Sequence, residues 1–141
     1  MKCTVILNPN REEEILIYAH ERSRLIEQIE QMASPKWVGY REQVSVVLNP
    51  ADVDCFIVED GKIQAVTNEG KFHVRARLYQ LEEKLSDSFV KINQSCLANM
   101  NRIARFEVSF GASLTVIFKN GYRDFVSRRQ VKQVKERLGI K

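Results

Sequence analysis

Near the C-terminus, apolar side chains recur with the period of an α-helix. The members of this stripe are Val131, Val134 and Leu138. They fall at i, i+3 and i+7, and therefore share one helix face. Ser127 is followed three residues later by Gln130, the pattern of a capping box at a helix start, and Gly139 stands where a left-handed residue commonly ends a helix. The pattern predicts a helix over about Arg128–Leu138.

Between residues 44 and 126 the apolar runs are short and separated by turn residues, as in β-strands. Strands are predicted at Val44–Leu48, Val53–Val58, Ile63–Thr67, Lys71–Arg75, Phe89–Ile92, Ile103–Val108, Ser113–Phe118 and Tyr122–Val126. Asp60-Gly61 is the best short hairpin signal, Asn120-Gly121 is a type I′ hairpin signal, and Leu78–Leu85 fits a short helix. The absence of a βαβ rhythm and of adjacent helices excludes doubly wound and helix-turn-helix folds. The predicted fold is mainly β, α+β overall: an antiparallel domain with short helices.

The first 36 residues form a separate pattern. Strands at Cys3–Leu7 and Ile15–Tyr18 are followed by a helix over Glu21–Ala33 and a join at Pro35–Arg41. We therefore predict a small ββα unit over residues 1–36 and a β domain over residues 37–141. Because so small a unit buries little core alone, we expect it to dock on the β domain or on a second copy in a homodimer.

Charge is divided unevenly along the chain. Residues 1–84 contain 11 Lys/Arg and 14 Asp/Glu, a net charge of −3, whereas residues 85–141 contain 11 Lys/Arg and 4 Asp/Glu, a net charge of +7. Arg128 and Arg129 also occupy the first turn of the predicted helix, where the helix dipole disfavours cations. A basic half of this kind is typical of a protein whose partner is a polyanion.

The sequence argues against a secreted, membrane-spanning or metal-binding protein. No apolar run approaches about 18 residues, and the N-terminus lacks the pattern of a signal peptide. Three widely spaced cysteines without a CxxC pair favour packed thiols in a reducing cytoplasm. They are Cys3, Cys55 and Cys96. Neither His20 nor His73 has a second ligand at metal spacing, so we expect no metal.

Catalysis is the weaker hypothesis, because no phosphate loop, GxSxG or HExxH motif occurs. Ser95 or Cys96 would need His73 as a base, and strand alternation places His73 toward solvent. The acidic pairs are expected at the surface for the same reason of alternation or helical spacing. They are Asp52/Asp54 and Glu82/Glu83. We expect no catalytic residue, no cofactor and no small-molecule substrate.

A polar run between apolar anchors, Asn93-Gln94-Ser95, suits an exposed loop. Asn and Gln can pair with adenine edges, and Ser can reach phosphates. With the flanking residues, FVKINQSCLANMNRI, and with VDCFIVEDGKIQAVTNEGKFHVRARLYQLEEKL and FKNGYRDFVSRRQVKQVKERLGI, the run resembles the LytTR family of bacterial DNA-binding domains over about residues 44–140. The resemblance implies a β fold whose loops contact two successive major grooves and the minor groove between them.

Carried over by position, the resemblance assigns DNA contacts to three loops. Arg129 would contact one major groove, Gln94 with Asn93 beside it the minor groove, and Lys62 in the loop 60–62 the other major groove. Supporting positions are Ser95, Ser127, Arg128 and, as a phosphate contact, Lys132. Ser95 and Asn99 match the family motif and would hold the loop, whereas the family often has His or Arg where Asn93 and Gln94 stand.

The N-terminal part is too short for the receiver domain that many relatives carry, which takes about 120 residues. The resemblance is therefore to a short subgroup without a receiver, and it implies a membrane protein as a regulatory partner. We predict a cytoplasmic transcription regulator that binds double-stranded DNA.

Two alternatives stay open. One is a protein-interaction module whose basic half docks an acidic or membrane-protein partner. The other is RNA binding, which calls for exposed stacking aromatics, whereas the strand phenylalanines fit a core. They are Phe89, Phe106, Phe118 and Phe125.

Overall fold

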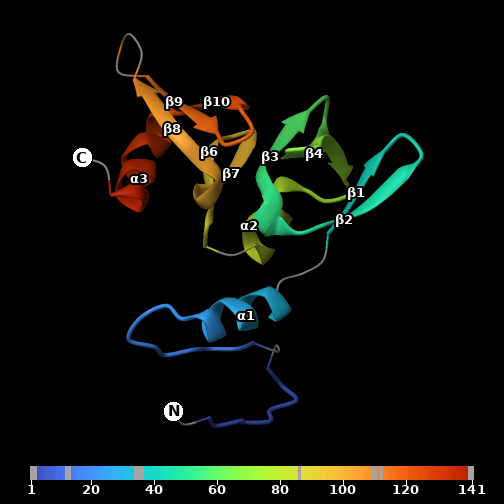
Figure 1. The fold of residues 1–141 in the computed structure, drawn as a ribbon, viewed down its shortest axis with the longest axis vertical. Coiled ribbons are helices and arrows are strands. Elements are labelled where there is room, and N and C mark those ends of the chain that lie inside the picture. Colours follow the sequence, from blue (N-terminus) through green and yellow to red (C-terminus); the bar gives the residue numbers. More distant parts are fainter. Residues whose placement is uncertain are drawn as a thin grey trace. The chain divides into compact units, whose positions relative to one another are not determined.

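The computed structural model describes residues 3–11, 14–33, 37–85, 87–108, 111 and 113–139 (Figure 1). The chain divides into two units, Met1–Ala33 and Ser34–Lys141. Within the described residues, no helix is long and apolar enough to cross a lipid bilayer.

In the described part of the first unit, the helix predicted from the sequence forms and the strands do not. α1 spans Arg24–Ala33, and the Ser23 hydroxyl accepts a hydrogen bond from the Ile26 N–H at 3.4 Å, so the helix begins after Ser23 rather than at Glu21. The two strands predicted at residues 3–7 and 15–18 are absent, since these residues pair with no strand among the described residues. A strand needs a partner to satisfy its backbone groups, and the described part of this unit supplies none.

The second unit is built on a seven-stranded antiparallel sheet with the order β2-β1-β5-β4-β3-β7-β6 (Figure 1). A three-stranded sheet, β10-β9-β8, completes it. The strands are β1 (Trp37–Arg41), β2 (Val44–Leu48), β3 (Val53–Glu59), β4 (Lys62–Thr67), β5 (Gly70–Val74), β6 (Phe89–Asn93), β7 (Cys96–Asn99), β8 (Ile103–Val108), β9 (Leu114–Phe118) and β10 (Arg123–Val126). Between them lie the helix α2 (Leu78–Lys84) and the short 3-10 turns Pro50–Asp52 and Met100–Arg102, and α3 (Arg128–Leu138) follows β10.

Two strands were not predicted from the sequence. β1 contains Gly39, where a Cβ would lie 2.7 Å from the Phe72 Cβ; the glycine marks a close approach of strands, and was misread as part of a join. All four residues of β7 are buried, so β7 lacks the alternation by which a half-exposed strand is recognised.

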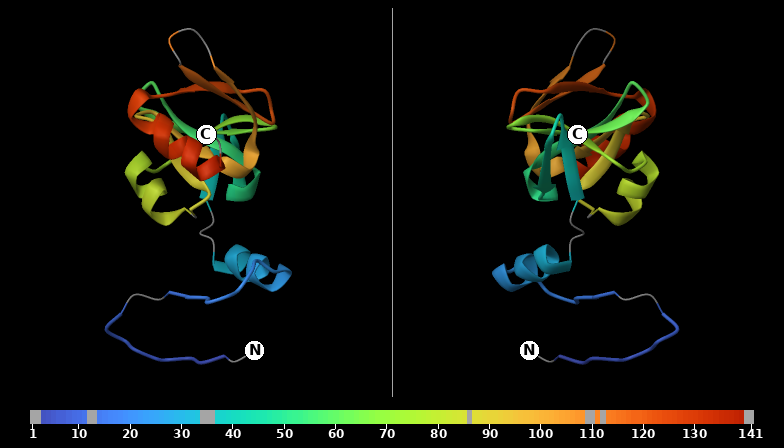
Figure 2. Two further views of the ribbon diagram at one scale, coloured as in Figure 1. Left: turned by 90° about the vertical axis from the view of Figure 1, so that its left-hand side faces the viewer. Right: turned by 90° about the vertical axis from the view of Figure 1, so that its right-hand side faces the viewer.

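Two apolar clusters occupy opposite faces of the large sheet. Cys55 and Ile57 of β3 belong to the first cluster, together with residues of β9, β10 and α3. Phe56 between them belongs to the second cluster, with Leu81 of α2. Alternation along β3 thus divides the core into two layers, and α3 packs on β6 and β10 (Figure 2).

The hairpin turns agree with the sequence in one case and differ in the other. The hairpin predicted at Asp60-Gly61 joins β3 to β4, and the two residues have φ of 53° and 74°, as in a type I′ turn. At Asn120-Gly121 only the glycine has a positive φ, 93°, and its N–H donates to the Phe118 carbonyl at 2.8 Å. This geometry is a three-residue connection ending in a left-handed glycine, so the type I′ prediction was wrong there.

α3 has the predicted bounds and ends at Gly139 with φ 69°. The predicted capping box is absent, because the Ser127 side chain makes no capping hydrogen bond. Instead the Ser127 carbonyl accepts the N–H groups of Gln130 and Val131 at 2.9 and 3.1 Å. The Ser127 N–H donates to the Ile92 carbonyl at 2.8 Å, which attaches the helix start to β6.

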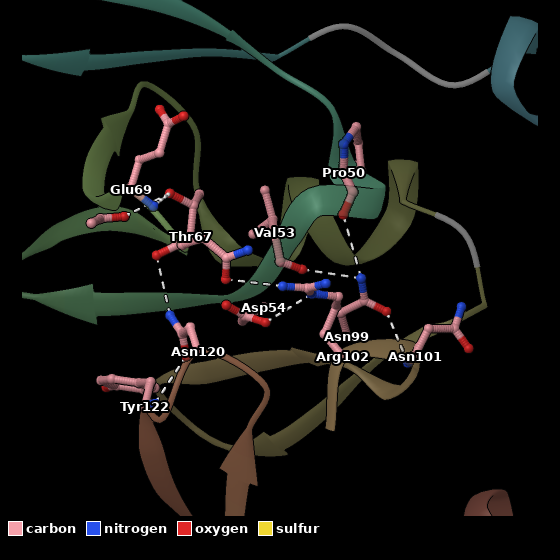
Figure 3. A network of polar contacts seen from close by, with 12 residues as sticks. Pro50, Val53, Asp54, Thr67, Glu69, Asn99, Asn101, Arg102, Asn120 and Tyr122 are labelled. Atoms are coloured by element: carbon pink, nitrogen blue, oxygen red, sulfur yellow. Dashed lines mark hydrogen bonds and ion pairs between the residues drawn. The ribbon is translucent and has the colours of Figure 1, made fainter. Parts of the chain in front are cut away.

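A polar network joins the ends of several strands (Figure 3). Asp54, predicted at the surface, is fully buried, and its carboxylate accepts the Arg102 Nε–H at 3.0 Å. A register shift between Val53 and Cys55 in the β3–β4 pairing turns Asp54 inward. The Asn120 amide reaches the Thr67 carbonyl at 3.1 Å, which ties the small sheet to the large one.

Candidate nucleic-acid interface

A groove of about 710 Å³ lies where the β6–β7 turn meets the start of α3. We call it the first groove. It brings together six of the eight residues predicted to contact DNA: Asn93, Gln94, Ser95, Ser127, Arg128 and Arg129. Lys62 and Lys132 do not line it. Residues more than 30 positions apart in the sequence therefore share one surface.

Asn93 differs from the other predicted contacts because its side chain is 4% exposed. Its amide nitrogen donates to Asp124 Oδ1 at 3.1 Å and to the Phe125 carbonyl at 2.8 Å. Its amide oxygen accepts the Ser95 N–H at 2.8 Å. Asn93 thus binds the β6–β7 turn to β10. The sequence predicted an exposed Asn93, and this was wrong, because the side-chain amide is buried and makes hydrogen bonds within the protein.

Gln94 and Ser95 form the exposed tip of the turn. The Ser95 carbonyl accepts the Val58 N–H at 2.9 Å, so the turn is fixed to β3 as well as to β10. Asn99 is buried, and its amide donates to the Val53 carbonyl at 3.0 Å. Of the two motif residues, Ser95 therefore holds the loop through its backbone, whereas Asn99, at the other end of β7, ties that strand to the start of β3.

The charges of the first groove are those of an anion site. Lys91, Arg128 and Arg129 line it, and within the described residues none of the three forms an ion pair. Its two carboxylates are already engaged. Glu59 lies 2.8 Å from the Lys71 ammonium, and Asp124 accepts from Asn93 and from the Phe125 N–H. Three exposed or half-exposed cations are left to face a ligand.

Two residues of the first groove were missed in the sequence. Phe125, expected in the core, is 58% exposed, whereas its neighbour Val126 is buried. Strict alternation in β10 places Phe125 on the same side as the exposed Arg123, and this signal was present in the sequence. Lys91 alternates outward from buried Val90 and Ile92 in the same way. The other strand phenylalanines are buried, except Phe106, which is half-buried.

Lys62 stands at the first position of β4, directly after the Asp60-Gly61 turn, and is exposed. It lines another groove, of about 530 Å³. The β3–β4 hairpin therefore presents Lys62 apart from the surface that carries Gln94 and Arg129.

The ionisable groups near the first groove do not resemble a catalytic site. The Cys55 thiol hydrogen-bonds Cys96 and, together with burial, raises the pKa of the Cys96 thiol well above its usual value. Burial and the nearby Asp124 carboxylate raise the pKa of Tyr122. Both groups stay protonated, whereas a nucleophile needs the opposite shift. Among the described residues, no cluster of three potential metal ligands occurs.

Comparison with known proteins adds an independent finding. The family model of the LytTr DNA-binding domain matches residues 43–139. An uncharacterized HTH-type transcriptional regulator of Staphylococcus aureus is 29% identical over 146 residues, which cover 99% of this chain and 99% of that protein. A similarly named relative from another strain is 32% identical over 103 residues, which cover 73% of this chain and 70% of its own length.

The fold is similar to a solved structure. A LytTr DNA-binding domain from Bacillus cereus superposes with a TM-score of 0.70 over 76% of this chain and 100% of that chain, at 19% identity. The relatives' names contain the term HTH-type, yet strands separate each α-helix from the next in the described part of this chain. Loops and a helix start, rather than a pair of adjacent helices, form the candidate surface.

Proposed function

Because the chain belongs to the LytTR DNA-binding domain family, we propose that it is a bacterial transcription regulator that binds double-stranded DNA through loops of its β domain. The observation that carries this proposal is the first groove, in which a polar turn meets three cations that have no ion pair among the described residues. We place its action in the cytoplasm and assign it no catalytic step and no cofactor.

Each exposed residue of the candidate surface has a proposed role. Arg129 contacts a guanine in one major groove, since a guanidinium matches the two acceptors of that base. Gln94 contacts the minor groove, and Lys62 on the β3–β4 hairpin enters the next major groove. Asn93 positions the turn that carries Gln94, because its own amide is consumed by internal hydrogen bonds.

We propose that the sequence-independent part of the DNA affinity comes from cations near these base contacts. Arg128 and Lys132 lie on α3 near Arg129, and each is exposed. Binding of such side chains to phosphates releases counterions, so the affinity falls steeply with salt.

Replacing Arg129 with alanine should remove discrimination at one base pair, a loss of about 1–3 kcal/mol on the selected site. Binding to random duplex should weaken much less. Lys135→Ala is the comparison, because Lys135 lies on the α3 face of Arg128 and Lys132, at i+7 from Arg128. Its affinity should fall equally on all sequences, and the slope of log affinity against log salt should decrease by about one. Fluorescence anisotropy on both duplexes, after selection of a site from a random pool, measures the two effects.

If the two substitutions act equally on selected and random duplex, the assignment of Arg129 to base contact is wrong. If the unaltered protein shows no salt-dependent affinity for any duplex, the alternative is favoured, namely a protein-interaction module that docks an acidic partner.

We further propose that residues 1–36 join two copies in a homodimer. Apolar side chains in the described part of this segment are exposed, among them Ile6 (83%), Leu7 (90%) and Tyr18 (94%). Residues 1–36 contain five Lys/Arg and six Asp/Glu, a net charge of −1, whereas residues 37–141 have a net charge of +5. Two copies of the basic domain repel each other, so self-association is favoured through the nearly neutral segment. Pairing across copies would supply the missing strand partners.

Leu7→Asp should then shift the full chain from dimer toward monomer, with at least about a tenfold weaker self-association, since 1.4 kcal/mol corresponds to tenfold. Thr4→Asp, which adds the same charge at a polar position, is the matched control. Sedimentation equilibrium measures both. If the unaltered chain is monomeric, the homodimer proposal is wrong. The exposed apolar segment would then be a binding surface for another protein, such as the membrane-protein partner that the family resemblance implies.

A further inference from the structure

The second groove, of about 530 Å³, lies beside the β3–β4 hairpin and has no role in the contacts assigned above beyond Lys62. Its polar lining is Lys62, His73, Arg75, Arg77 and Gln80. None of its lining residues is acidic. A cavity lined by cations and free of carboxylates favours an anionic ligand.

The cations of the second groove have no ionic partner in the part of the chain that the structure describes. Within the described residues, Lys62, Arg75 and Arg77 form no ion pair, whereas nearby Lys71 is paired with Glu59 at 2.8 Å. All three side chains are exposed. Their charge is therefore available to a ligand that approaches from solvent.

Two of the side chains are held in place by neutral groups. The Arg75 guanidinium lies 4.4 Å from the centroid of the Tyr40 ring, a cation–π contact that orients it without cancelling its charge. His73 Nδ1 lies 3.1 Å from the Ile63 carbonyl oxygen, which can only accept, so Nδ1 carries the hydrogen. Because these side chains are already oriented, they lose less conformational entropy when a ligand binds.

The second groove lies next to the β3–β4 hairpin. Gly61, Lys62 and Ile63 line it, and Val58, near the end of β3, lines both grooves. The cations of the second groove therefore flank the hairpin that carries Lys62. A nucleic-acid backbone that passes along the hairpin presents repeated negative charge to them. The exposed cations fit a polymer backbone better than a small ion, which a protein normally encloses with buried donors.

We propose that the second groove binds backbone phosphates of the duplex next to the hairpin, with Arg77 and Arg75 as the phosphate contacts. This inference rests on the proposed DNA-binding function and extends its footprint beyond the family-assigned loops. Since phosphate contacts fix position and not sequence, the groove sets how the hairpin lies in its major groove.

The test is the salt dependence of DNA binding by full-length Arg77→Gln. The slope of log affinity against log salt should fall by about 0.9 for each phosphate that the variant no longer neutralises, on selected and random duplex alike. Lys84→Gln is the matched control, because Lys84 is exposed, ends the helix that begins just after Arg77, and lines neither groove. Its slope should equal that of the unaltered protein, and thermal melting should show both variants folded.

A second measurement locates the phosphate. Selected duplexes in which one phosphate at a time is replaced by neutral methylphosphonate should include one that weakens the unaltered protein severalfold but leaves Arg77→Gln unaffected. If the unaltered protein binds with a salt slope and Arg77→Gln behaves as Lys84→Gln does, this inference is overturned while the proposed function stands. If the unaltered protein has no salt-dependent affinity for duplex, both fail. If inorganic phosphate protects the second groove but the DNA slope is unchanged in Arg77→Gln, the groove holds a small anion and the inference is likewise wrong.

Discussion

Asn93→Asp is expected to abolish site-specific DNA binding and to destabilise the domain by about 3 kcal/mol, within the range for buried groups that lose their partners. The substitution keeps the shape of the side chain and the acceptor for the Ser95 N–H. It removes the two hydrogen bonds donated to Asp124 and Phe125, and places a carboxylate against the Asp124 carboxylate and a carbonyl oxygen. Urea unfolding followed by circular dichroism gives the stability change, and anisotropy gives the binding change.

The neighbouring residue supplies the control for this prediction. Gln94 is exposed, so Gln94→Ala should change the free energy of unfolding by no more than about 0.5 kcal/mol. It should still weaken the discrimination between A·T and G·C pairs at the minor-groove position. If Asn93→Asp remains as stable as the unaltered protein and loses only discrimination, Asn93 contacts DNA directly and its internal hydrogen bonds break on binding.

Replacing Arg102 with methionine should destabilise the fold by about 3–5 kcal/mol near neutral pH, the usual cost of stranding one member of a buried ion pair. Asp54 is fully buried, and its Oδ2 has no hydrogen-bond partner among the described residues. Arg102 Nε supplies the 3.0 Å contact to Oδ1, while another nitrogen of the same guanidinium donates to Asn68. Methionine fills a similar volume and offers neither charge nor donor.

The destabilisation should depend on pH with a definite sign. Burial raises the pKa of the Asp54 carboxyl, and Arg102 acts against that rise. A carboxyl whose pKa is higher in the folded state than in the unfolded chain binds its proton more tightly when folded. Its contribution to the unfolding free energy therefore grows as pH falls toward the ordinary value and is lost as pH rises through the folded pKa. Without Arg102 that pKa rises further, so Arg102→Met should be less destabilising at about pH 5 than at about pH 7.5.

Arg105→Met is the control for Arg102, because the Arg105–Glu107 pair is more than 40% exposed on both sides. Its removal should cost at most about 1 kcal/mol. A destabilisation by Arg102→Met that is equally small, or one that does not shrink at lower pH, would show that Asp54 and Arg102 are not coupled as the structure implies.

The elements that follow a single regular pattern could be predicted from the sequence. α3 was predicted with its bounds, and the strands from β2 to β5 within two residues, because alternation or helical spacing and the turn residues agree there. The resemblance to the LytTR family rested on three stretches, which cover β3 to α2, β6 to β7 and β9 to α3, and it is confirmed.

The failures have a common physical origin in contacts that are distant in sequence. Residues 3–7 have the composition of a strand, but a strand forms only where another strand lies beside it. Asp54 follows the alternation of a surface residue until a bulge reverses it. Asn93 stands in a polar run that is typical of a loop, yet its hydrogen-bond partners are more than 30 residues away in β10. The local pattern of apolar and polar residues predicts neither the burial of Asn93 nor that of Asp54.

The different roles of Asn93 and Gln94 affect how the DNA preference of such proteins can change in evolution. The side chain that holds the turn and the side chain that faces outward are adjacent in sequence but separate in function, because only the first is part of the folded interior. Substitution at position 94 can therefore alter the preferred DNA sequence without a cost in stability, whereas substitution at position 93 cannot. Duplicated copies of such a gene could acquire different target sites through a few exposed positions while the rest of the domain stays unchanged.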